Sequence, residues 1–156
     1  MSITIRPLAP ADADACDAIV LSHPDFFGHA EGRVDCARAV RSQAGWVADD
    51  AGRVVGFATW APRTPATAEV TWMAVHRSRC HEGVGTAIIE ALITDLRTRG
   101  FRLVLAMTSA GPKRPADAPD TYAPTRQFWL ARGFLPLIEL EIWDTDTALL
   151  QVRPIT

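Results

Sequence analysis

The residues with the clearest chemical potential are two glycines in a turn, Gly83-Val84-Gly85, at the start of a predicted helix. The turn follows a predicted strand that ends at Val75. The first four amide N–H groups of a helix have no intrahelical acceptor, and the helix dipole adds partial positive charge at the same end. Glycines also let the backbone approach a ligand closely. A strand, a tight turn and a helix N-terminus in this order therefore predict a binding site for a pyrophosphate group.

The elements that must position this turn follow from the spacing of apolar residues. Val84, Ile88, Leu92 and Leu96 recur every four residues and Gly100 follows, which predicts a helix over residues 84–99. Alternating and turn-bounded segments predict the other elements in the same way. Strands are expected at 2–6, 46–48, 53–60, 66–75, 102–107, 137–143 and 148–152, helices at 11–21, 31–42 and 123–132, and a long loop at 108–121.

Two motifs in this order resemble the Gcn5-related N-acetyltransferase (GNAT) family. The segment Cys80-His81-Glu82-Gly83-Val84-Gly85 takes the place of the family motif Arg/Gln-x-x-Gly-x-Gly/Ala, with Cys80 as a departure from it. Phe128-Trp129, followed by Gly133-Phe134, resembles the family's C-terminal signature. The resemblance implies one domain over residues 1–156 with an α+β fold. That fold is a mixed, mostly antiparallel sheet of about seven strands, flanked by about four helices, whose fourth and fifth strands splay apart.

The resemblance also implies acetyl-CoA as co-substrate and no metal. The turn would hold the pyrophosphate, and the strand before it would hold the pantetheine arm, with one amide polarising the thioester carbonyl. Arg77 and Arg79 either supply positive charge to the turn or are solvated turn residues, and Arg126 either reaches a CoA phosphate or anchors the preceding loop. The expected cofactor-binding residues are Met73, Ala74, Val75, Arg77, His81, Glu82, Gly83, Val84, Gly85, Thr86, Arg126 and Trp129.

An acetyl acceptor must first lose a proton, because a free ammonium group has a pKa near ~10. Glu69, six residues before Val75, is the best candidate for the base. In histone-acetylating relatives a glutamate at this offset is the general base. The alternative is an ordinary surface glutamate on a strand, and Asp25, Asp49 and Asp50 are weaker candidates.

The departing thiolate needs a proton, which many relatives take from a tyrosine four residues before the glycine of Gly-Phe. Trp129 occupies that position here and has no acidic proton. Tyr122, the only tyrosine, precedes Trp129 by about two helical turns and is expected to donate to the thiol instead. Alternatively, Tyr122 packs the loop and the thiolate leaves unaided. Cys80 is expected to be a tolerated departure rather than a nucleophile, with a thiol made reactive by the helix N-terminus.

The acceptor side carries the weakest signal. The segment between the first two helices offers Phe26 and Phe27, and a strand offers Trp60. These three aromatic residues predict a wall for a small amine with an apolar part. They serve equally well as core residues.

Composition narrows the remaining possibilities. A net charge of about −2 argues against a nucleic-acid partner, which would need a basic surface. The N-terminus has no long apolar run, so neither a signal peptide nor a membrane span is expected. The cysteines Cys16, Cys36 and Cys80 lie far apart without metal-ligand spacing, which favours a reducing cytoplasm. The expected partners are acetyl-CoA and an amine acceptor, and a homodimer stays open.

Together these features predict an acetyl-CoA-dependent N-acetyltransferase that acts directly on a primary amine of a small molecule or peptide. The alternative is a catalytically weak or inactive acyl-CoA-binding module with a sensor or regulatory role. The residues at Cys80 and Trp129 favour the alternative, whereas Glu69, Tyr122 and the glycine turn favour the enzyme.

Overall fold

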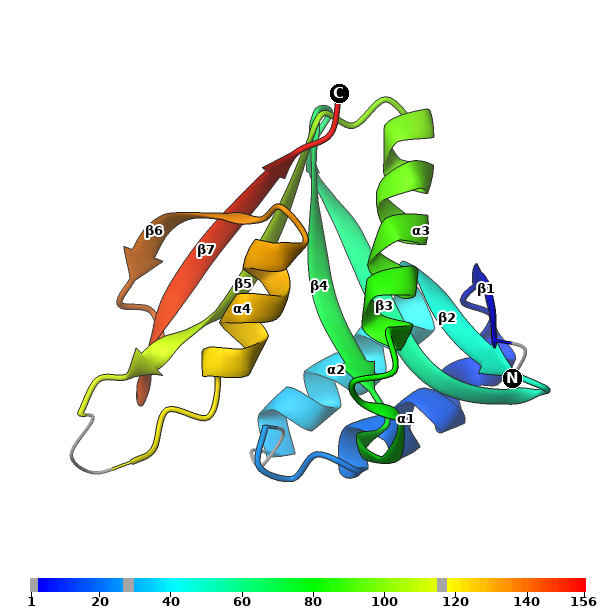
Figure 1. The fold of residues 1–156 in the computed structure, drawn as a ribbon, viewed down its shortest axis with the longest axis horizontal. Helices are drawn as coiled ribbons and strands as arrows, with labels where there is room; N and C mark the ends of the chain where they lie inside the picture. Colours follow the sequence, from blue (N-terminus) through cyan, green and yellow to red (C-terminus); the bar gives the residue numbers. More distant parts are fainter. Residues whose placement is uncertain (1–2, 27–29, 115–117) are drawn as a thin grey trace.

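The protein forms one seven-stranded sheet in strand order β1-β2-β3-β4-β5-β7-β6 (Figure 1). The structure is a computed structural model that describes residues 3–26, 30–114 and 118–156. All neighbouring strands are antiparallel except β4 and β5, which are parallel. The strands are β1 Ile3–Pro7, β2 Ala44–Asp50, β3 Arg53–Thr64, β4 Thr67–Val75, β5 Leu103–Pro112, β6 Leu135–Leu140 and β7 Asp146–Pro154.

Helices cover both faces of the sheet and enclose a core on each (Figure 1). On one face, α1 (Ala13–Leu21) and α2 (Ala30–Ser42) pack against β2, β3 and β4. On the other face, α3 (Val84–Thr98) and α4 (Ala123–Ala131) cover a larger core. Two short 3₁₀ helices complete the described part of the chain, at Pro10–Asp12 and Arg77–Arg79. The predicted fold class, α+β with a mostly antiparallel sheet, is confirmed.

Helix α3 shows how the apolar pattern builds the larger core. Ile88, Leu92 and Leu96 are fully buried on its inner face, as their four-residue spacing predicts. Gly56 on β3 lets the helix lie close, because a Cβ there would be 2.9 Å from the Ile88 side chain. Gly100 follows the helix with a φ of 92°, a left-handed conformation that glycine adopts without strain.

One predicted boundary is wrong in a way that affects the site. The strand expected at residues 102–107 continues as β5 to Pro112, although its last residues have a loop-like composition. The extension pairs with β7, with a register shift between Ser109 and Gly111. The hydrogen bonds of this long-range ladder outweigh the local preference for a loop. Strand β6 also begins and ends earlier than expected, at Leu135–Leu140.

Candidate functional site

The central strands β4 and β5 are joined over only part of their length. Their parallel pairing ends at Val70, opposite Ala106. The next residue, Thr71, is an extra residue on β4, because the register with β3 shifts between Thr59 and Trp60. A bulge of this kind bends a strand. Beyond it β4 stays paired with β3, β5 stays paired with β7, and the two strands diverge (Figure 1).

The free edge of β4 presents backbone groups to the region between the diverging strands. The His76 amide donates to the Val55 carbonyl on β3 at 2.8 Å, so the preceding residue, Val75, turns its backbone groups away from β3, and its carbonyl accepts from His23 Nε2 at 2.5 Å. Residues two apart in an antiparallel ladder turn their backbone groups the same way. Met73 therefore turns its amide away from β3 as well, while the Ala74 side chain is buried under α1 and α2. These amides lie where the sequence predicts a pantetheine-binding strand.

The turn before α3 is an open row of amides. His81 and Gly83 have φ values of 68° and 83°, so both residues are in the left-handed region just before the helix begins at Val84. The first backbone hydrogen bond of the helix runs from Ala87 N to the Gly83 carbonyl. Within the described parts of the chain, the amides of residues 80–86 have no acceptor. Such a group of free donors at a helix N-terminus is suited to an anion.

Position 85 requires a glycine for a steric reason. A Cβ there would lie 2.9 Å from Met73 Cε and 3.3 Å from Phe128 Cε1. Gly85 therefore lets the β4 edge, the first turn of α3 and the α4 helix come together at one point. Phe128, which sequence reasoning noted only as part of a motif, is the aromatic residue that reaches this point.

The two predicted arginines next to the turn are held by carboxylates. Arg79 bonds to Asp50 at 2.8 Å and to Glu82 at 3.1 Å. Arg77 pairs with Asp25, and its Nε donates to the Ser22 carbonyl at 2.7 Å. Arg77 thus ties the end of β4 to the segment after α1, and Glu82, which is exposed, partly neutralises the charge beside the turn.

Arg132 is the cation at the turn that sequence reasoning missed. Its guanidinium donates to the Thr86 hydroxyl in the first turn of α3 and lies over the Phe128 ring, 5.7 Å from its centre. The residue stands directly before Gly133 in the C-terminal motif. That position was the available signal, but only the packing of α4 on α3 brings the charge to the anion site.

Cys80 corrects one prediction. Burial raises the pKa of its thiol above the usual value, and the nearby Arg77 only partly offsets this effect. Its Sγ can donate to the Val75 carbonyl oxygen at 3.7 Å and to the His76 carbonyl oxygen at 3.6 Å. The thiol is therefore partly sheltered, and burial opposes the reactivity that the sequence predicted for it.

Glu69 faces α2 from β4, two residues before the bulge, where the strand is still paired with both β3 and β5. Its Oε1 accepts from Arg63 Nε at 2.8 Å, and its side chain is 20% exposed. Beside it, the Thr71 hydroxyl donates to Gln43 Oε1 at 2.5 Å and contacts Thr59 Oγ1 at 2.8 Å. These groups line a groove of about 380 Å³ between α2 and β4, which contains the carboxylate predicted as the base.

Tyr122 stands immediately before α4 and bridges to the segment after α1. Its hydroxyl donates to the Phe26 carbonyl at 3.5 Å, and the two rings meet edge to face with centres 5.0 Å apart. Burial raises the pKa of Tyr122, and the charges of Asp146 and Asp25 add to the effect, so the phenol keeps its proton near neutral pH. The structure thus brings Phe26 and Tyr122 together, while the predicted contact Phe27 lies outside the described residues.

Two predicted contact residues lie in the core instead. Trp60 is 8% exposed and packs against Phe101 under the end of α3, on the face of the sheet opposite Glu69 and α2. The predicted aromatic wall does not therefore include it. Trp129 is 6% exposed and packs edge to face on Phe134 and Phe128. The physical reason is the same for both residues, since large indole rings contribute more by filling the core than by facing solvent.

Arg126 follows the second of its predicted alternatives. Its Nη1 donates to the Ser109 carbonyl at 2.8 Å, and its Nη2 pairs with Asp120. The guanidinium lowers the pKa of Asp120. Arg126 therefore anchors the end of the loop to the last part of β5.

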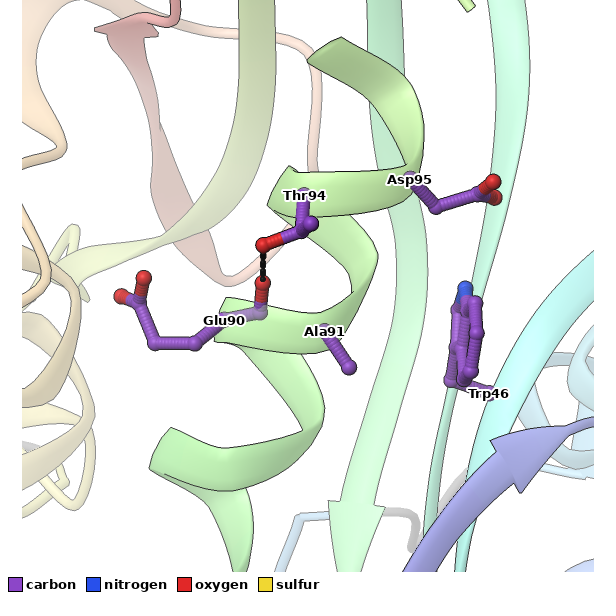
Figure 2. Close-up of a pocket in the computed structure, with 5 residues that line it drawn as sticks. All are labelled: Trp46, Glu90, Ala91, Thr94 and Asp95. Carbon is purple, nitrogen blue, oxygen red and sulfur yellow. Dashed lines mark hydrogen bonds between the residues drawn. The ribbon is translucent and has the colours of Figure 1, made fainter. Parts of the chain in front are cut away.

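A second hollow, of about 450 Å³, lies between α3 and β2 (Figure 2). It is lined by Trp46, Glu90, Ala91, Thr94 and Asp95. Figure 2 shows the Glu90 carboxylate pointing away from Trp46, and both acids are already paired, with Arg153 and Arg99 at 3.0 Å. This hollow is separate from the bulge and the turn, and none of the predicted site residues lines it.

The described residues contain no group of three or more histidine, cysteine, aspartate or glutamate side chains that could hold a metal ion. Within the same residues, no helix is both long and apolar enough to cross a membrane.

Comparison with known proteins identifies one family. The model of the acetyltransferase (GNAT) family matches residues 13–117. No curated protein matches the chain. Among solved structures, a GNAT-family protein from Desulfovibrio desulfuricans is 24% identical, with a TM-score of 0.86 and coverage of 99% of this chain and 100% of the other.

Two further solved structures share the fold. The ribosomal-protein-S18-alanine N-acetyltransferase from Escherichia coli is 18% identical, with a TM-score of 0.78 and coverage of 99% and 95%. A Salmonella typhimurium protein solved with its cofactor acetyl-CoA is 17% identical, with a TM-score of 0.72 and coverage of 100% and 95%.

Proposed function

Because this chain belongs to the acetyltransferase (GNAT) family, we propose that it transfers the acetyl group of acetyl-CoA directly to a primary amine of a small molecule or peptide. One observation carries the proposal. The bulge at Thr71, where β4 leaves β5, lies on the strand that leads into the turn of free amides at residues 80–86. A ligand with a pyrophosphate at one end and a thioester at the other matches that arrangement.

Acetyl-CoA would be held mainly by backbone groups. The amides from His81 to Thr86 suit the pyrophosphate, and the β4 edge from Met73 to Val75 suits the pantetheine arm. Arg132 adds a guanidinium at the first turn of α3. Of the two predicted arginines, Arg77 would have to leave Asp25 to reach a phosphate.

The transfer balances without a covalent enzyme intermediate. The acceptor ammonium gives one proton to a base, and its nitrogen lone pair attacks the thioester carbonyl carbon. The C–N bond forms as the C–S bond breaks, and the sulfur takes up a proton. The nitrogen then releases its second proton, so the products are an amide, CoA thiol and one proton. A backbone amide of the bulged strand can stabilise the developing oxyanion, an effect worth about 3–4 kcal/mol in other enzymes.

Glu69 is our candidate for the base, and Tyr122 for the acid. The side chain of Glu69 reaches a groove at the bulge, and Oε2 has no hydrogen-bond donor among the described residues, so it is available to an ammonium group. Tyr122 is protonated and lies at the start of the helix that flanks the diverging strands. Its weak 3.5 Å bond to Phe26 leaves the hydroxyl able to reorient.

The second candidate function is acyl-CoA binding without turnover. It is favoured by the buried Trp129 at the position where many relatives have a tyrosine, and by the Arg63 guanidinium that occupies one oxygen of Glu69. A screen for CoA thiol release from acetyl-CoA, with amines, amino acids, polyamines and peptides as acceptors, decides between the two. An acceptor-dependent rate supports transfer. Tight acetyl-CoA binding by calorimetry, with no acceptor raising thiol release, supports the binding module.

A cytoplasmic location and a homodimer stay predictions. The dimer is supported by β6, one of the two edge strands of the sheet, which exposes Leu135, Leu137 and Ile138 by more than half. Exposed apolar edge strands are sites where a second chain can pair. Light scattering of the purified protein measures the oligomeric state directly.

A further inference from the structure

The groove beside Glu69 has a charge pattern that restricts the acceptor, given the proposed acetyl transfer on which this inference rests. It lies between α2 and the outer face of β4, next to the bulge, and has a volume of about 380 Å³. That volume is at the small end of the range for small-molecule sites. Most of the residues that line it are polar, with Asp35, Arg38, Gln43, Arg63, Glu69 and Thr71 among them.

Two guanidinium groups in this groove keep unused donors. Arg63 donates from Nε to Glu69, which leaves its two terminal nitrogens without an acceptor among the described residues. Arg38 approaches Asp35 at 3.6 Å, which is beyond hydrogen-bond distance, and its side chain is 73% exposed. The planar end of a guanidinium matches a carboxylate with two parallel hydrogen bonds.

The groove therefore offers complementary charges for both ends of a small zwitterion. The free oxygen of Glu69 can accept from an ammonium group, and the terminal nitrogens of Arg63 can donate to a carboxylate beside it. The direct bond between Arg63 and Glu69 keeps these two charges close together. With Asp35 beside Arg38, the groove carries two carboxylates and two guanidinium groups, so it matches a ligand without net charge better than a polyamine.

We infer that the acceptor is a free amino acid, or another small amine with a carboxylate one carbon away. In this arrangement Arg63 and Arg38 bind the carboxylate, and the ammonium lies against Glu69 near the bulge. The Gln43 side chain, held by Thr71, adds an amide group to the same wall. This differs from the aromatic pocket predicted from the sequence.

The test uses matched acceptors, each amino acid and its carboxamide, with acetyl-CoA and the full chain. The amide keeps the amine and side chain but removes the negative charge. We expect kcat/KM for at least one amino acid to exceed that for its amide by about 10–100-fold, because the loss of one charge-assisted hydrogen bond has an effect of this size. Arg63→Gln should erase the difference by raising the KM of the amino acid, and Arg38→Gln should reduce it. Arg97→Gln, on the exposed side of α3, is the matched control and should leave kcat/KM unchanged for both the amino acid and its amide.

Two outcomes would overturn the inference while leaving acetyl transfer intact: efficient acetylation of amides or polyamines over amino acids, or an unchanged KM in Arg63→Gln. A separate binding measurement tests the groove even if the proposed acetyl transfer is wrong. Ligand-observed NMR with amino acids and no acetyl-CoA detects binding to the groove without chemistry. Binding that Arg63→Gln abolishes supports the site even if no acceptor is acetylated, and absence of both binding and turnover contradicts it.

Discussion

Replacing Glu69 by glutamine is the sharpest single perturbation of the proposed chemistry. The amide keeps the size of the side chain but cannot take a proton from the acceptor. Assistance by a general base is worth about 10²–10⁴-fold in rate. At 1.36 kcal/mol for each tenfold change, this is about 2.7–5.4 kcal/mol of barrier. We therefore expect kcat to fall by at least a hundredfold.

The structure separates this loss from damage to the fold. The Arg63–Glu69 pair is partly exposed, with side chains 47% and 20% accessible, so it stabilises the protein by about 0–1 kcal/mol at most. For a chain of this length, that corresponds to a shift in Tm of no more than about 2–4 °C. The acetyl-CoA contacts are expected on the β4 edge and the α3 turn, so the affinity for acetyl-CoA should stay within about twofold of wild type, a difference of about 0.4 kcal/mol.

The assay measures kcat by thiol release with saturating acceptor, acetyl-CoA affinity by calorimetry and Tm by circular dichroism. Glu139→Gln is the matched control, because Glu139 lies on the exposed edge strand β6 and should leave all three quantities unchanged. A folded Glu69→Gln protein with kcat within twofold of wild type would refute the reasoning. Water alone, or an acid from another part of the site, would then act as the base.

Four further predictions test other parts of the account. Gly83→Val should reduce acetyl-CoA affinity in calorimetry and destabilise the fold by about 1–2 kcal/mol, because φ is 83° there; unchanged affinity would remove the turn from the site. Cys80→Ser should retain turnover, and acetyl-cysteine at this position in mass spectra would contradict direct transfer. Tyr122→Phe should slow turnover with acetyl-CoA affinity preserved, and an unchanged rate would leave the residue a packing role. Burial raises the pKa of Cys16 and Cys36 from 9.0 to about 12, so the unfolded chain loses these protons first and stability should fall as pH rises from 9 toward 12. The double alanine variant should flatten that fall in thermal unfolding, and an equally steep decline would exclude the two thiols as its cause.

Local features of the site were predictable from the sequence. The turn at Gly83 depends on residues that are neighbours in the chain, and the apolar spacing of α3 fixes where its N-terminus lies. The family resemblance then supplied the mixed, mostly antiparallel sheet and the divergence of the central strands, but not the strand order at the β6 edge. Glu69 was selected because the family resemblance places a base six residues before Val75. The spacing alone would put both side chains on one face of the strand, and only the bulge at Thr71 turns Glu69 to the α2 side.

The remaining features depend on contacts between distant segments. Arg132 reaches Thr86 only because α4 packs on α3. Arg38 and Arg63 share a groove only because α2 crosses the face of β4. Trp60 was misplaced for the same reason. Alternation along a strand does not show which face of the sheet a side chain occupies, and the ring packs in the core under α3. Side-chain placement across the sheet is therefore the part that sequence patterns do not encode.

The most direct test of the central claim is a mass balance with acetyl-CoA carrying an isotopically labelled acetyl group. The wild-type chain is incubated with a pool of amino acids, amines and peptides, and mass spectrometry follows both products. We predict one labelled N-acetyl product for each CoA released, with no label on the protein and with release dependent on the acceptor. Release that is independent of any acceptor, or bound acetyl-CoA that never yields an acetylated amine, would contradict the claim.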